Sequence, residues 1–148
     1  MPSILDESRR EVLCGRLGAL RPESQARWGR MSVGAMLSHL GQSTRMALGE
    51  LEVAPKHMRA FQVFPLKHLI LYVLPFPKGA PTAPELLAAP PGAFEADQQT
   101  LLALVRRLGT GPREGAGPTH PLFGSLSRQE WGTLVHKHTD HHLRQFGV

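Results

Sequence analysis

The chain has a single cysteine, Cys14, among its 148 residues, so it cannot form an internal disulfide. A chain of this length buries roughly 70% of its unfolded surface, and its core therefore needs neither a disulfide nor a structural metal. The N-terminus lacks the charged, apolar and cleavage regions of a signal peptide. The longest uninterrupted apolar run, residues 69–76, has eight residues, whereas a membrane-spanning helix needs roughly 20. These absences predict a cytoplasmic protein with no membrane partner.

Aromatic residues and long basic runs are also scarce. The 17 lysines and arginines exceed the 12 acidic residues, which gives a formal charge of +5. Basic residues nevertheless occur at most in pairs and are interleaved with acids, and one tyrosine and two tryptophans provide no series of stacking platforms. The sequence therefore predicts a solvated basic surface and no nucleic-acid partner.

Glycine and proline are concentrated in two stretches instead of being spread along the chain. These stretches are residues 75–92 and residues 109–121, and both are predicted to be long connections. No internal repeat is present. We expect one domain over residues 1–148.

Between these connections the apolar residues recur at helical spacing. Ser3, followed by Asp6, resembles a capping box and predicts a helix that ends near Leu20. Ser32 is a good N-cap for a second helix that ends at about residue 48, with Met31 and Met36 in the positions of a hydrophobic staple.

Two further helices are predicted in the second half of the chain. One begins near Phe94, has acids in its first turn and arginines in its last, and should stop at Gly109. The other begins at Ser127, where Glu130 completes a capping box, and runs to Phe146. Residues 56–74 are predicted to form a short irregular helix. Because alternating strands are absent, the predicted fold class is all-α, a four-helix bundle with long Pro/Gly-rich loops and an irregular extra helix in the middle.

Histidines cluster in the predicted last helix, where four of the eight lie in residues 136–142. At 100° per residue, His138 and His142 share the apolar stripe that contains Trp131, and His136 and His141 lie to either side. An i, i+4 pair of this kind directs two imidazoles toward one point, as in helices that supply two metal ligands. The spacing is equally compatible with hydrogen-bonded core histidines. His39, on the flank of its own helix, is more typical of a structural residue.

Motifs of other enzyme classes are missing. There is no Glu-x-x-His pair for a carboxylate di-iron site and no Gly-x-Ser-x-Gly elbow. Residues 109–114 fail a dinucleotide-binding fingerprint, because the last glycine is absent and the segment follows a helix. Cys14 is interpreted as a small core residue.

The histidine-bearing segments resemble those of the DinB-like (YfiT-like) superfamily of four-helix-bundle metalloenzymes, in an uncharacterised branch formed by a domain of unknown function. The most specific segments are Met-Leu-Ser-His at 36–39 and His-Thr-Asp-His-His-Leu-Arg-Gln at 138–145. Residues 27–32, 75–85, 120–124 and 130–132 also match that branch. The resemblance extends from about Arg21 onward, and the first helix matches only as a generic amphipathic one.

The resemblance implies that His39, His138 and His142 bind a divalent metal, most often zinc or nickel. It also places His141 in the second shell or at the rim of the site. Gln145, on the histidine face, is expected either to orient a ligand or substrate or to make a structural hydrogen bond. Three imidazoles leave coordination positions open, which is typical of a catalytic metal site.

The expected function is a metal-dependent hydrolase that acts on a small-molecule substrate through a metal-bound water held by the three histidines. Two alternatives stay open. One is a thiol-dependent S-transferase or isomerase with a metal-activated thiolate, which the resemblance suggests. The other is a non-enzymatic metal-binding or dimerisation module, and a homodimer is compatible with all three. The sequence identifies no general base.

Overall fold

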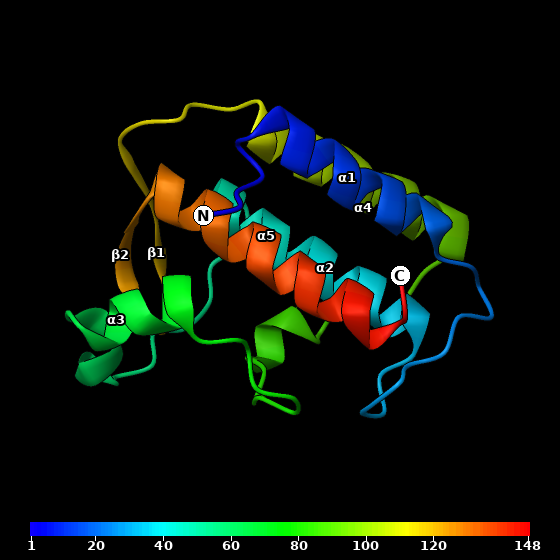
Figure 1. Cartoon of the computed structure of the whole chain (residues 1–148). Coiled ribbons are helices and arrows are strands. Elements are labelled where there is room, and N and C mark those ends of the chain that lie inside the picture. Colours follow the sequence, from blue (N-terminus) through cyan, green and yellow to red (C-terminus); the bar gives the residue numbers. More distant parts are fainter.

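Four long helices dominate the computed structural model, which describes all 148 residues (Figure 1). They are α1 (Glu7–Ala19), α2 (Val33–Leu48), α4 (Phe94–Gly109) and α5 (Arg128–Gln145). Both α1 and α2 pack against α4 and against α5, so the four helices enclose one hydrophobic core. No helix combines the length and the apolar character needed to cross a membrane.

The predicted starts of α2 and α5 are confirmed by their caps. The Ala35 N–H donates to Ser32 Oγ at 3.1 Å. In α5 the Glu130 N–H donates to Ser127 Oγ and the Ser127 N–H donates to Glu130 Oε2, at 3.1 and 2.7 Å, which is a complete capping box. These caps fix where the two histidine-bearing helices begin.

The predicted start of α1 at Ser3 is wrong. Asp6 is the N-cap and accepts the Arg9 N–H at 3.1 Å, while Ser3 Oγ accepts the Leu5 N–H. The helix starts later because Ile4 is fully buried and its N–H donates to the Gly132 carbonyl of α5. The residues before Asp6 form a turn instead, in which the Asp6 N–H donates to the Ser3 carbonyl at 3.2 Å.

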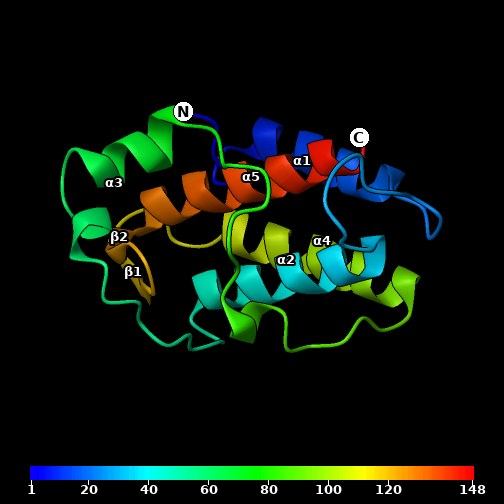
Figure 2. The ribbon, with the colours of Figure 1, turned by 90° about the horizontal axis from the view of Figure 1, so that it is seen from below.

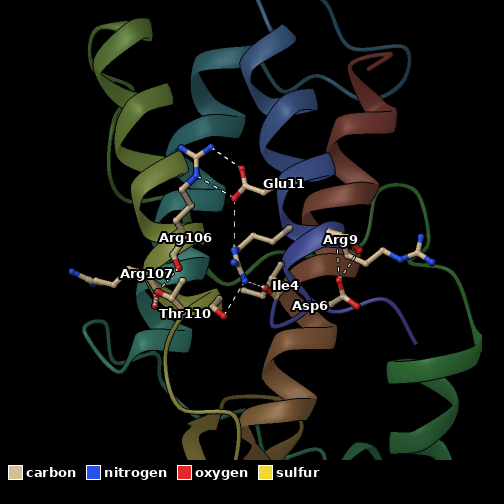
Figure 3. Close-up of polar contacts among 10 residues, drawn as sticks. Ile4, Asp6, Arg9, Glu11, Arg106, Arg107 and Thr110 are labelled. Carbon is tan, nitrogen blue, oxygen red and sulfur yellow. Dashed lines mark hydrogen bonds and ion pairs between the residues drawn. The ribbon is translucent and has the colours of Figure 1, made fainter.

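Gly109 is the last residue of α4, so this helix stops where the sequence predicted. Its role is close packing, since a Cβ there would lie 2.4 Å from Cδ of Arg10. The buried Arg10 guanidinium donates to the carbonyls of Ile4 and Gly109 at 3.0 and 3.1 Å. Arg106 of α4 also donates to Glu11 of α1, and Figure 3 shows this contact joining the two helices.

The all-α prediction is wrong for residues 116–127, which form a hairpin of β1 (Ala116–His120) and β2 (Gly124–Ser127). Its register pairs His120 with Gly124 and is irregular between Ala116 and Thr119. Gly124, with φ 69°, takes the left-handed conformation that closes a three-residue hairpin loop. The β1 residues, Ala-Gly-Pro-Thr-His, lack apolar alternation, which is why the sequence predicted a loop.

The irregular helix predicted over residues 56–74 is present as three short pieces: a 3₁₀ turn (Arg59–Gln62), α3 (Leu66–His68) and a π-helical turn (Leu69–Val73). Lys137 of α5 anchors it by donating to the carbonyls of Ile70 and Leu71. The connection that follows includes a 3₁₀ turn (Pro84–Leu86) and passes across α5 and α2, as Figure 2 shows in green.

Candidate metal centre

Three histidines from two helices converge between α2 and α5. His138 Nε2 lies 2.9 Å from Nε2 of His39 and 3.1 Å from Nε2 of His142. All three ligand atoms lie within 4.8 Å of one another. One helical turn separates the two α5 histidines, and the packing of α2 on α5 supplies the third. The structure thus brings together the three residues that the resemblance implied.

Hydrogen bonds at the other ring nitrogens indicate where two of the protons lie. His39 Nδ1 faces the Leu86 carbonyl oxygen at 3.4 Å, and His142 Nδ1 faces Gln145 Oε1 at 2.8 Å. The Gln145 amide is oriented by its own Nε2, which donates to the Trp28 carbonyl at 3.0 Å. Because both facing oxygens are acceptors, each Nδ1 must be the donor. The neutral rings of His39 and His142 therefore present bare Nε2 lone pairs to the centre.

His138 completes this cluster with a nitrogen that faces both partners. Its Nδ1 contacts the Ser43 hydroxyl at 3.1 Å. Its Nε2 carries at most one proton, which can be donated to the Nε2 lone pair of either His39 or His142 but not fully to both. At least one nitrogen of the cluster therefore lacks a hydrogen-bond partner within the cluster. Imidazole nitrogens about 2.0–2.1 Å from one tetrahedral zinc would stand roughly 3.3 Å apart. The three nitrogens, which lie within 4.8 Å of one another, could therefore hold a divalent metal ion.

Burial keeps these imidazoles neutral. His39 is 2% exposed and His142 is 8% exposed, whereas His138 retains more exposure. Desolvation lowers the pKa of His39, lowers the pKa of His142 to about 4, and holds the pKa of His138 well below its usual value. Metal ligation requires unprotonated nitrogens. The three rings are in that state at neutral pH.

His141 lies beside the cluster without belonging to it. Its ring centroid is 5.3 Å from that of His142, 5.8 Å from that of Trp28 and 6.0 Å from that of Phe76. His136 is not part of the convergent group. The i, i+4 pattern therefore separated the inward histidines of α5 from the peripheral ones.

Gln145 makes the two hydrogen bonds described above, so its position on the histidine face is structural support for His142. Sequence reasoning missed Ser43 and the Leu86 carbonyl. Ser43 lies four residues after His39, so helical spacing provided a signal for it. The Leu86 carbonyl had no such signal, because the contact depends on the path of the connection across α2.

No carboxylate belongs to the cluster. Asp140 is close in sequence, but it is paired with Arg16 at 2.6 Å and with Arg144 at 3.0 Å. The Coulombic effect of Asp140 on the pKa of His141 is smaller than the lowering by burial. The structure therefore adds no carboxylate general base to the site.

The fold and the site define a mostly helical protein with a buried three-histidine cluster. Residues 5–147 match the model of a family described as "Protein of unknown function (DUF1569)", so the chain belongs to that family. Comparisons with curated proteins and with solved structures found no match.

Proposed function

We propose that this chain is a metal-dependent hydrolase that acts on a small molecule, with zinc or nickel held by His39, His138 and His142. The supporting observation is the convergence of three Nε2 atoms, two of which are left without protons by their Nδ1 hydrogen bonds. We further propose that the four long helices form a bundle of the DinB/YfiT type. A bundle of this kind places metal ligands on facing helices.

A divalent ion held there would polarise a substrate carbonyl and lower the pKa of a coordinated water to about 7. The chain contributes orientation and desolvation. Leu86 and Gln145 hold the rings of His39 and His142 through their Nδ1 protons. Phe76 packs edge-on against His138, at 5.9 Å between centroids, and gives that ring an apolar neighbour.

The missing carboxylate supports a second candidate, a thiol-dependent S-transferase or isomerase. A metal-stabilised thiolate is already a nucleophile and needs no general base at the site. A hydrolase would rely on the ion alone to activate water. The two functions therefore differ in whether turnover requires an added thiol.

The ligand assignment is tested by metal content. Tag-free protein expressed with trace metals should hold close to one divalent ion per chain, and His138→Ala should lose it while remaining helical by circular dichroism. His136→Ala, which changes a neighbouring α5 histidine outside the cluster, is the matched control and should keep the ion. Stoichiometric metal in His138→Ala and His142→Ala would contradict the assignment.

The reaction class is tested with the metal-loaded protein and panels of esters, amides and electrophiles, each with and without low-molecular-weight thiols. Hydrolysis without thiol that is lost in His138→Ala would support the first candidate. Turnover only with thiol would replace it with the second. No turnover above that of free metal in either arm would favour a non-enzymatic metal-binding module.

A further inference from the structure

Two segments border the partly exposed side of the histidine cluster with aromatic rings. Trp28 comes from the connection between α1 and α2, and Phe76 comes from the connection between α3 and α4. Both rings stand edge-on to His141, at 5.8 and 6.0 Å between centroids. Phe76 also contacts His138, so one of the two rings lies directly beside a histidine of the cluster.

Lys78 places a positive charge at the same border. Its Nζ lies 4.4 Å from the centroid of the Trp28 ring. The side chain is exposed and takes part in none of the seven ion pairs or the side-chain hydrogen bonds of the structure. Lys137, the other lysine stacked on an aromatic ring here, donates instead to backbone carbonyls of the irregular helix. Lys78 is thus a cation with no anionic partner.

The backbone segments that carry Trp28 and Phe76 are restrained. Pro75 and Pro77, on either side of Phe76, each have a fixed φ. Phe76, because it precedes Pro77, is itself restricted to extended conformations. Trp28 is tied to the cluster, because its carbonyl accepts the Gln145 amide that also orients His142. A ligand would therefore bind to a largely preformed surface at a low ordering cost.

We propose that Trp28, Phe76 and Lys78 form an anion subsite for the substrate of the metal centre. This inference rests on the proposed function and names its substrate class, a small carboxylate with a flat apolar body. The body contacts the edges of the Trp28 and Phe76 rings beside His141, and the carboxylate pairs with Lys78, whose Nζ lies over the Trp28 ring. A single lysine without an arginine fork matches one negative charge better than a phosphate dianion.

The test uses benzoate and its neutral isostere benzamide as probes, with tryptophan fluorescence as the readout. Both metal-free and zinc-loaded protein are titrated, so that binding at the subsite is measured apart from binding to the ion. Trp28→Phe identifies the reporter, because Trp131 is almost fully buried in the core. The variant is Lys78→Gln, and its control is Arg113→Gln, an exposed cation in the connection between α4 and β1.

We expect both forms of the wild-type protein to bind benzoate more tightly than benzamide. Lys78→Gln should weaken benzoate binding about fivefold, as for one exposed ion pair, and leave benzamide binding unchanged. Equal binding of the two probes in wild type, or equal weakening of both by Lys78→Gln, would overturn the subsite. If zinc fails to bind while metal-free protein still prefers benzoate through Lys78, the subsite stands and the metal-dependent function fails.

Discussion

The stability of the metal-free protein should depend on pH through His120, a histidine outside the metal cluster. Its Nδ1 accepts the N–H groups of Leu122 and Phe123 at 3.0 and 3.1 Å, which holds the hairpin loop. The ring packs against Phe123 and Trp131. Burial lowers its pKa from 6.5 to about 4.

The direction of the effect follows from the two protonation equilibria. Above pH 6.5 the ring is neutral in both states and no stability is lost. Between pH 6.5 and about 4 the unfolded chain takes up a proton that folded His120 resists, so stability falls as the pH falls. At about 1.4 kcal/mol per pKa unit, the loss from this residue reaches about 2.5 kcal/mol at pH 4.5. That is a large share of a typical folding free energy of 5–15 kcal/mol.

The assay compares wild type with His120→Asn by urea unfolding of metal-free protein at pH 7.0 and at pH 4.5. Asparagine keeps a side-chain acceptor for the loop N–H groups but does not titrate. The variant should lose about 2.5 kcal/mol less than wild type between the two pH values. His57→Asn, at an exposed position, is the control and should follow wild type. An equal pH dependence in His120→Asn and wild type would refute the reasoning.

Two further predictions concern packing and ligand orientation. Gly132→Ala should destabilise the protein by about 1–3 kcal/mol in urea unfolding, because the added Cβ would lie 2.5 Å from Ser3 Oγ and 2.7 Å from Leu5 Cγ. Gly41→Ala is the control: it lies in the interior of α2 with no neighbour within 4 Å, and it should stabilise the protein by roughly 0.5–1 kcal/mol. A change of the same sign in both variants would contradict the packing argument. Gln145→Leu should weaken zinc binding about 10- to 100-fold in a competitive chelator titration, since His142 Nδ1 loses its acceptor, whereas Gln145→Glu, which keeps one, should lose less.

The long helices were predictable because their signals are local. Ser32 and the Ser127–Glu130 box are short patterns whose hydrogen bonds form within one helical turn. The start of α1 was not predictable, because burial of Ile4 against α5 decides it. The hairpin was missed for a similar reason. Its strands are short and Gly/Pro-rich, and the contact of Gly117 with Trp131, where a Cβ would lie 2.4 Å from Cδ1, depends on tertiary packing.

In the candidate site, too, local patterns indicated some residues, and tertiary packing placed the others. Helical spacing alone placed His138 and His142 on one face, because both belong to α5. It gave no such indication for His39, which lies on another helix and was implied only by the family resemblance. The Leu86 carbonyl and the ring of Phe76 reach the cluster through the connection over α5 and α2, and no local pattern encodes that path.

The division of the three imidazoles between two helices has a consequence for the order of assembly. α5 alone, once helical, presents His138 and His142 as a bidentate chelate that needs no tertiary structure. The third imidazole arrives only when α2 docks, so an ion at the centre and the α2–α5 interface would stabilise each other through thermodynamic linkage. Removing such an ion with a chelator would loosen α2 from α5 and leave the α1–α4 contact, joined by Arg10 and Arg106, unaffected. The ion would then serve as an interhelical crosslink as well as a reactive centre.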